Sequence, residues 1–219
     1  MAKKENILPL IIEQGLLPLY YDDDADVSIE VLKTLYSAGI RVVEYTNRGR
    51  QALRNFKKMR KVCDEELRDM HLAAGTIKNK KAARQFIDAG ADFIISPGMV
   101  KEVADVADKS NLLWIPGCMS ATEIIHAENS GAKLVKIFPG NILGPSFVSS
   151  IRDIFPDLLF MPTGGVEIDS ENIAAWFKAG VCAVGMGSKL LSKELLQNKD
   201  YAAIRGLVLK AIFIVNSAR

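Results

Sequence analysis

Short apolar runs recur along the chain, and each is followed by a segment with the residue spacing of an amphipathic helix. Eight runs stand at intervals of roughly 20 to 32 residues, which matches one strand and one helix per repeat. They are LLPLYY (16–21), IRVVEYT (40–46), HLAAGT (71–76), DFIISPG (92–98), LLWIPG (112–117), LVKIFPG (134–140), LFMPTGG (159–165) and CAVGMG (182–187). Several are almost continuously hydrophobic, as strands buried on both faces of a parallel sheet are. The chain is therefore predicted to alternate strands and helices.

The segments between the runs carry helix stop signals. VSIEVLKTLYSAG, KKAARQFIDAG and SENIAAWFKAG each end at a glycine, which suits the residue after a helix. An open doubly wound sheet would show a similar alternation, but no G-x-G-x-x-G follows the first run, and eight strands suit closure. We therefore expect a single domain over residues 1–219, a (β/α)8 TIM barrel with a short amphipathic N-terminal helix.

Length and composition restrict the class of protein. With 219 residues, 49% of them hydrophobic, the chain is long enough for one sizeable core. Its formal net charge of +2, without a Lys/Arg block, argues against a nucleic-acid partner. Three cysteines at wide spacings fit a reducing cytosol better than a disulfide framework. Pro9 interrupts the first apolar stretch, and no apolar run is expected to be long enough to cross a bilayer, so we expect a cytoplasmic protein without a membrane partner.

Two charged residues stand inside predicted strands. Glu44 lies within VVEYT and Lys136 within LVKIF, whereas most other charged residues fall on predicted helices and loops. Burying an ionised group without a partner costs several kcal/mol even after relaxation, so such residues are kept for a reason. One interpretation is a structural salt bridge that holds the barrel interior together.

The other interpretation of this pair is catalytic, since (β/α)8 barrels place their chemistry at the C-terminal ends of the strands. Removing an amine from water favours its neutral, nucleophilic form, whereas a nearby carboxylate favours the ammonium. The pair makes more chemical sense if Glu44 exchanges protons during turnover than if it only neutralises Lys136. Lys133 is the competing nucleophile, but it stands at the N-terminal end of the same strand.

Small and polar residues end several of the other predicted strands. These ends are Arg48, Thr76, Ser96-Pro97-Gly98, Thr163-Gly164-Gly165 and Gly187-Ser188. Glycines and small hydroxyls after strands seven and eight match the usual phosphate site of such barrels, where backbone N–H groups cradle the anion. Ordinary turn chemistry is the alternative explanation for these glycines. Arg48 is a candidate carboxylate clamp, because a guanidinium binds anions through two parallel hydrogen bonds.

The histidine, cysteine and tyrosine side chains are weaker candidates for metal binding or catalysis. His71 and His126 have no His or Cys neighbour at ligand spacing, so we expect no metal. Cys118 is better explained as a small core or loop thiol than as a nucleophile, because no histidine base is suggested nearby. Tyr20 and Tyr21 are core or interface candidates, one of which could reach the pocket.

Taken in order, GIRVVEYTNR, AAGT, FIISPG, IPG, KIFPG, MPTGG and VGMGS resemble the motifs of the 2-keto-3-deoxy-6-phosphogluconate and 4-hydroxy-2-oxoglutarate aldolases. Each motif is modest alone, but the ordered set, from about residue 5 to the C-terminus, is highly specific. The resemblance implies a class I aldolase, a carbon–carbon lyase of carbohydrate metabolism (the Entner–Doudoroff pathway), on a (β/α)8 barrel. It also implies a homotrimer that needs no metal or organic cofactor.

The resemblance further implies a role for each matching residue. These are Lys136 as the Schiff-base lysine, Glu44 as the general acid/base, Arg48, Thr76 and Thr163 at the substrate carboxylate, Gly164, Gly165, Gly187 and Ser188 at the phosphate, and Phe138 beside the imine. Pro97, at a strand end, completes the expected pocket. The chain departs from the family pattern at Asn47, Gly140, Met186 and the arm that holds Tyr20 and Tyr21, which bears on sugar stereochemistry and leaves the lyase chemistry intact.

The expected reaction cleaves 2-keto-3-deoxy-6-phosphogluconate to pyruvate and glyceraldehyde 3-phosphate, and/or 4-hydroxy-2-oxoglutarate to pyruvate and glyoxylate. The galactonate-derived epimer is an alternative substrate, because it differs at one hydroxyl. Another barrel enzyme for phosphorylated ligands, a decarboxylase or synthase, is an alternative without a covalent adduct. A non-catalytic barrel that binds a sugar phosphate is the alternative of a different class.

Overall fold

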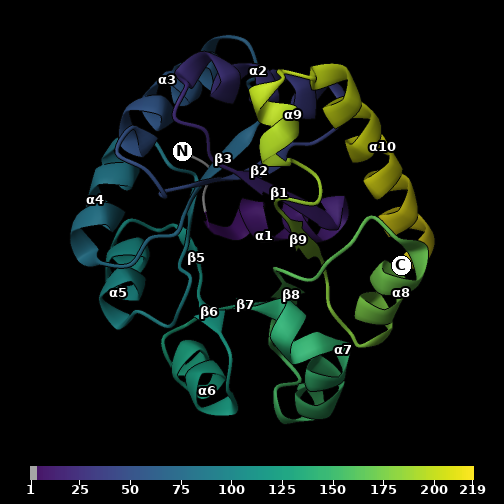
Figure 1. The fold of residues 1–219 in the computed structure, drawn as a ribbon. Helices are drawn as coiled ribbons and strands as arrows, with labels where there is room; N and C mark the ends of the chain where they lie inside the picture. Colours follow the sequence, from purple (N-terminus) through teal and green to yellow (C-terminus); the bar gives the residue numbers. More distant parts are fainter. Residues whose placement is uncertain (1–3) are drawn as a thin grey trace.

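The computed structural model describes residues 4–219, and residues 1–3 of the predicted domain lie outside this range (Figure 1). The strands are β1 (Leu16–Tyr20), β2 (Val42–Thr46), β3 (His71–Gly75), β4 (Phe93–Ile95), β5 (Leu113–Ile115), β6 (Gly117–Cys118), β7 (Leu134–Ile137), β8 (Leu159–Pro162) and β9 (Val184–Met186). The helices are α1 (Lys4–Gln14), α2 (Ala25–Ser37), α3 (Ala52–Glu65), α4 (Lys80–Asp88), α5 (Lys101–Lys109), α6 (Ala121–Asn129), α7 (Gly140–Ile151), the 3-10 helix η1 (Arg152–Ile154), α8 (Ser170–Lys178), α9 (Lys193–Gln197) and α10 (Tyr201–Ala218). Strands therefore form within all eight predicted runs, and helices separate them.

The strands pair in parallel in two groups. Six of them follow the order β5-β4-β3-β2-β1-β9, and three follow the order β6-β7-β8. The register places Leu19 of β1 beside Glu44 of β2, and Glu44 beside Ala73 of β3. In the second group, Gly117 of β6 stands beside Lys136 of β7. Because every pair is parallel, the carboxyl ends of the strands share one edge of the fold.

The regular eight-stranded barrel predicted from the sequence is confirmed in part, as a curled parallel sheet. Pro116 separates β5 from β6 within one apolar run, because proline has no N–H to donate to a strand ladder. The backbone at this break still bonds to β7, since Lys136 N donates a hydrogen bond to Pro116 O at 2.8 Å. At the other junction, Thr163 and Gly185 form one isolated parallel bridge between the turn after β8 and strand β9. A further backbone hydrogen bond, from Cys182 N to Phe160 O at 3.0 Å, lies at the same junction. The two sheets thus meet through a few isolated backbone contacts in place of full ladders.

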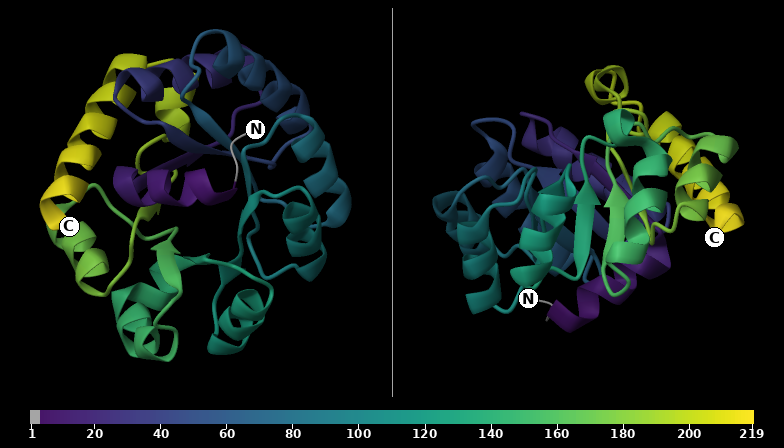
Figure 2. Two further views of the ribbon diagram at one scale, coloured as in Figure 1. Left: turned by 180° about the vertical axis from the view of Figure 1, so that it is seen from behind. Right: turned by 90° about the horizontal axis from the view of Figure 1, so that it is seen from below.

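Helices surround this sheet, and α1 closes one end of it. Figures 1 and 2 show α2 to α8 and α10 around the outside, with α1 lying across the strands. Ile7 and Ile11 of α1 are buried in one core cluster with inward-facing strand residues such as Phe93 and Met161. A larger cluster lies between the strands and the outer helices. The predicted N-terminal helix is confirmed, and it fills the sheet interior away from the carboxyl strand ends.

Strand alternation determines which side chains face the interior. Val42 and Leu134 belong to the inner cluster with Ile7 and Ile11. Side chains two residues apart on a strand point to the same face. Glu44 and Lys136 therefore point into the curled sheet, nearer to the carboxyl strand ends than the apolar layer beside α1.

Helix α10 corrects one expectation from the sequence. Its 18 residues have a mean hydropathy of 1.4, so by length and composition this helix reaches the level of a membrane span. Its packing gives a different account of the apolar residues, because Ile204, Val208, Ala211 and Val215 form a buried face at helical spacing. The helix packs against α2 and α8 on the outside of the fold. The expectation that no apolar run would be long enough was therefore wrong.

Candidate active site

Lys136 and Glu44 contact each other inside the curled sheet. Lys136 Nζ lies 3.4 Å from Glu44 Oε2, and the two side chains are 5% and 1% exposed. The residues come from β7 and β2, so the curl of the sheet brings them together. The carboxylate is therefore the charged group that the buried amine contacts directly. The structural salt bridge and the catalytic pair considered in the sequence analysis both require this contact.

Gly75, at the end of β3, makes room for Glu44. A Cβ at this position would overlap Glu44 Oε1 and would lie 2.5 Å from Glu44 Cγ. The backbone of Gly75 is not in the left-handed region, so space and not backbone geometry explains the glycine. Sequence reasoning gave Gly75 no role. The signal is the register that places β3 beside β2, which a single sequence does not contain.

Two buried oxygens near this contact have no hydrogen-bond partner among the described residues: Glu44 Oε1 and Thr163 Oγ1. Buried polar atoms are almost always paired, so each of these oxygens is a candidate contact for a ligand or water. Thr163 is 5% exposed and follows β8 directly. A Cβ on the bridging Gly185 would overlap Thr163 Oγ1, so that glycine leaves space for the hydroxyl.

Phe138 and Pro97 border the lysine. The Lys136 Nζ atom lies 5.3 Å from the centroid of the Phe138 ring. Pro97 packs over Gly117, the register partner of Lys136, where a Cβ would lie 2.5 Å from Pro97 C. Both side chains are half-buried. The structure therefore places Phe138 beside the candidate nucleophile and Pro97 over the adjacent strand β6.

Thr76 follows β3 in a strained conformation. Its φ of 58° lies in the left-handed region, which is unusual for a β-branched residue. Such conformations cost of order 1–3 kcal/mol and concentrate at functional sites. The residue directly follows Gly75 and is half-buried, so it belongs to the rim around Glu44.

Gly164 and Gly165 form the turn after β8, with φ values of 87° and 72°. A Cβ on Gly165 would lie 2.6 Å from Asn141 Cα, and a Cβ on Gly140 would overlap Gly164 O. Gly140 N also donates to Thr163 O at 2.8 Å. Turn geometry and the close approach of α7 thus account for these two glycines and for Gly140, one of the departures from the family pattern.

Arg48, Gly187 and Ser188 share a cavity of about 370 Å³ above the carboxyl ends of β1, β2 and β9, which we call the mouth cavity. Arg48 and Ser188 are exposed, and Gly187 is half-buried. The lining is Leu19, Tyr20, Tyr21, Asp22, Asp23, Arg48, Gly187, Ser188, Leu191, Lys193 and Leu196. Of the predicted site residues, the structure gathers these three here and places Lys136, Glu44 and Thr163 deeper in the sheet. Lys193 is a cavity residue that sequence reasoning missed, because it belongs to a short helix without a motif.

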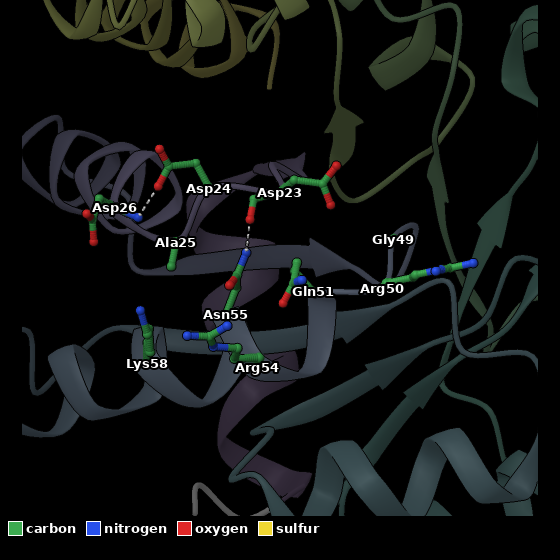
Figure 3. A pocket seen from close by; sticks show the side chains of 10 residues that line it. All are labelled: Asp23, Asp24, Ala25, Asp26, Gly49, Arg50, Gln51, Arg54, Asn55 and Lys58. Atoms are coloured by element: carbon green, nitrogen blue, oxygen red, sulfur yellow. Dashed lines mark hydrogen bonds between the residues drawn. The ribbon is translucent and has the colours of Figure 1, made fainter.

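A larger groove of about 730 Å³ lies beside the mouth cavity and shares Asp23 with it. Figure 3 shows Arg50 pointing away from Arg54 and Lys58, which both belong to α3. The amide of Asn55 donates to Asp22 O at 3.1 Å and to Asp23 O at 3.0 Å. The groove is thus the seam where α3 anchors the loop between β1 and α2. Its lining is Asp23, Asp24, Ala25, Asp26, Gly49, Arg50, Gln51, Arg54, Asn55 and Lys58.

Cys118 and the aromatic arm have structural explanations. Burial raises the pKa of Cys118 to about 12, so its thiol stays protonated at neutral pH. Tyr20 is buried and donates to Ser28 O at 2.6 Å, whereas Tyr21 lines the mouth cavity. Within residues 4–219, no group of three or more His, Cys, Asp and Glu side chains is placed to hold a metal ion.

Known proteins match this chain along most of its length. The family model for KDPG and KHG aldolases matches residues 8–207. The 2-dehydro-3-deoxy-phosphogluconate aldolase of Pseudomonas aeruginosa is 30% identical over 213 residues, covering 96% of this chain and 93% of that protein. The 2-dehydro-3-deoxy-6-phosphogalactonate aldolase of Escherichia coli is 32% identical over 120 residues, covering 54% of this chain and 58% of that protein.

A solved structure is similar as well. The KDPG aldolase from Legionella pneumophila, with pyruvate captured at low pH as a covalent carbinolamine intermediate, has a TM-score of 0.81 to this chain. The two are 26% identical, and the match covers 91% of this chain and 95% of that one. The matching proteins are aldolases, which are lyases that cleave carbon–carbon bonds. This chain belongs to the KDPG and KHG aldolase family.

Proposed function

We propose that the protein is a class I aldolase that cleaves 2-keto-3-deoxy-6-phosphogluconate to pyruvate and glyceraldehyde 3-phosphate, and 4-hydroxy-2-oxoglutarate to pyruvate and glyoxylate. The observation that carries the proposal is the buried contact of 3.4 Å between Lys136 Nζ and Glu44 Oε2 in a member of this family. A salt bridge that served stability alone would be expected to satisfy both carboxylate oxygens, whereas Glu44 Oε1 has no partner in the described chain.

Lys136 is the proposed nucleophile. Its ammonium first gives a proton to Glu44, directly or through one water, which the 3.4 Å separation supports. The neutral amine then attacks the C2 carbonyl of the substrate and forms a carbinolamine. Glu44 returns the proton to the departing hydroxyl, so that loss of water gives a protonated imine and restores the Glu44 carboxylate. The Phe138 ring beside Nζ limits the access of water to this step.

Glu44 is the proposed acid/base for bond cleavage. Its carboxylate accepts the proton of the C4 hydroxyl, the C3–C4 bond breaks, and the electron pair moves into the imine to form an enamine. The aldehyde leaves, and a proton returned to C3 gives the pyruvate imine. Hydrolysis of that imine releases pyruvate and restores Lys136.

Two anion sites are proposed around the pair. At the carboxylate, the strained Thr76 and the unpartnered hydroxyl of Thr163 support an oriented imine, with Arg48 as the cationic contact. The phosphate is proposed to lie farther out along the carboxyl strand ends. The residues proposed for it are Gly164, Gly165, Gly187 and Ser188.

A pyruvate assay coupled to lactate dehydrogenase tests the reaction. The substrates are the gluconate-derived and galactonate-derived phosphorylated keto acids and 4-hydroxy-2-oxoglutarate. We expect the gluconate-derived epimer to be cleaved fastest. The galactonate-derived epimer is the second candidate, favoured by the partial match to the Escherichia coli phosphogalactonate aldolase. Absence of pyruvate release from all three would overturn the proposal.

We also propose that residues 1–219 form one domain, a (β/α)8 barrel in which β5 and β6 together count as one strand. The Thr163–Gly185 bridge supports closure of this barrel. The protein is proposed to work as a cytoplasmic homotrimer with pyruvate-type keto acids and without a metal or organic cofactor. Exposed Ile142, Ile154 and Phe213 support contact between copies, and the free cysteines suit a reducing compartment.

A further inference from the structure

Lys193, the first residue of α9, lines the mouth cavity with Arg48 and Ser188. The short helix α9 holds the backbone of Lys193 in place. Ser192 caps α9, since its side chain accepts a hydrogen bond from Leu195 N at 3.2 Å. Leu196, four residues after Ser192, is buried against the core. The ammonium of Lys193 is therefore carried by a fixed backbone and lies at an exposed position beside the cavity.

Within the described chain, the acidic side chains around the cavity have hydrogen-bond partners, whereas the basic ones do not. Asp22 Oδ1 accepts a hydrogen bond from Asp24 N at 2.8 Å, and Asp23 Oδ1 accepts one from the Tyr21 hydroxyl. In contrast, the side chains of Lys193 and Arg48 make no ion pair or hydrogen bond with any other residue in 4–219. The carboxylates of the cavity accept hydrogen bonds within their own loop. Because Arg48 is proposed for the substrate carboxylate, Lys193 is the cation that remains available to a second anion.

Gly187 lines this cavity, and neither its backbone angles nor its packing requires a glycine. Its φ is not in the left-handed region, and a Cβ would meet the Leu19 side chain at 3.4 Å, an ordinary contact. Gly164 and Gly165, in contrast, require their glycines for turn and packing. An alanine would fit at Gly187, so the glycine is better explained by the approach of a ligand to the backbone.

The position of the cavity identifies which part of a substrate reaches it. Leu19 is the register partner of Glu44, and the cavity begins at Leu19 and extends beyond the strand ends. A substrate joined to Lys136 through C2 and deprotonated by Glu44 at C4 presents its far end to this region. We propose that Lys193 binds the phosphate at that end and sets the preference for phosphorylated keto acids. This inference rests on the proposed function.

Calorimetric binding of 3-phosphoglycerate, an unreactive analogue of the phosphorylated aldehyde, tests the site without turnover. Lys193→Ala is expected to weaken its binding about tenfold, a change of about 1.4 kcal/mol. Glycerate, which lacks the phosphate, is the matched ligand and should bind equally to both proteins. Lys189→Ala is the matched variant, because Lys189 Nζ pairs with Glu167 Oε2 at 3.1 Å and does not line the cavity.

The kinetic counterpart is the ratio of kcat/KM for the phosphorylated substrate to kcat/KM for 4-hydroxy-2-oxoglutarate. We expect this ratio to fall about tenfold in Lys193→Ala, to recover in Lys193→Arg and to stay unchanged in Lys189→Ala. An unchanged ratio, or an equal loss in the Lys189 variant, would overturn the assignment. If pyruvate were never released but 3-phosphoglycerate binding still required Lys193, the reaction would fail and the phosphate site would stand. If pyruvate were released but 3-phosphoglycerate binding did not depend on Lys193, the proposed reaction would stand and the phosphate site would fail.

Discussion

At the level of single residues, the proposed chemistry depends on the space around the Glu44 carboxylate. One oxygen contacts Lys136, and the other has no partner in the described chain. The second oxygen occupies space that a side chain at Gly75 would fill. A carboxylate held in this way keeps lone pairs free for proton exchange, whereas a fully bonded one resists it.

Gly75→Ala is expected to lower kcat at least tenfold, because the methyl group must displace the Glu44 carboxylate from Lys136. The backbone of residue 75 accepts alanine, so the effect should appear in kcat more than in thermal unfolding. Gly206→Ala is the control, because a Cβ there meets no heavy atom within 4 Å. The coupled pyruvate assay measures both variants. An unchanged kcat in Gly75→Ala would contradict the proton-transfer role of Glu44.

Cys118 provides a pH-dependent prediction. Burial raises the pKa of this thiol to about 12, so at pH 8 only about one molecule in 10⁴ carries the thiolate. A raised thiol pKa means that the neutral, unreactive form persists until the pH approaches 12. Iodoacetamide at pH 8 is therefore expected to leave Cys118 unmodified and pyruvate release intact, as peptide mass spectrometry and the coupled assay would show. Rapid alkylation accompanied by inactivation would mean that the thiol takes part in the reaction.

Sequence reasoning located Lys136 and Glu44 because a charge inside an apolar run is visible without any structure. It did not locate Gly75 or Lys193. The effect of Gly75 depends on the register between β2 and β3, and that of Lys193 depends on where a five-residue helix packs. Both are consequences of tertiary structure, so local pattern and spacing do not encode them.

At the level of elements, the alternation of strands and helices followed from the hydrophobic pattern, but the details of the strand ends did not. The run 112–117 holds β5 and the first residue of β6, because Pro116 interrupts the ladder between them. Helix α7 contains Gly144 with φ 70° and ψ 170°, followed by Pro145, so it consists of two helical pieces. The glycines at strand ends looked equivalent in the sequence, whereas their backbone angles and neighbours separate them into turn glycines and an open glycine.

This distinction predicts opposite effects for two alanine substitutions. Gly165→Ala is expected to destabilise the fold by more than about 1 kcal/mol, because φ is 72° and the new Cβ would lie 2.6 Å from Asn141 Cα. Gly187→Ala should unfold like the parent protein but raise KM for the phosphorylated substrate. Urea denaturation and the coupled assay together measure both effects. A large loss of stability in Gly187→Ala would show that this glycine is structural after all.

At the scale of the whole molecule, α1 fills one end of the curled sheet and leaves the carboxyl strand ends for chemistry (Figure 2). The sequence predicted chemistry at the carboxyl strand ends, from the polar and glycine residues that follow the strands. It predicted an N-terminal helix, but not that this helix would fill the opposite end. Closure of the sheet was harder to predict, because it depends on single backbone contacts such as the Thr163–Gly185 bridge. The outward side of α10 exposes Leu209 and Phe213. The periodicity of the sequence does not specify this surface, which bears on the proposed contact between copies.

The most direct test of the account is reduction with borohydride in the presence of pyruvate, followed by peptide mapping. Fragment ions must separate Lys136 from Lys133, which lies three residues earlier on the same strand segment. Borohydride without pyruvate is the control. The account predicts one reduced pyruvate adduct per chain, located on Lys136, and none in Lys136→Arg. An unmodified Lys136, or an adduct on Lys133, would contradict the central claim that Lys136 is the covalent nucleophile.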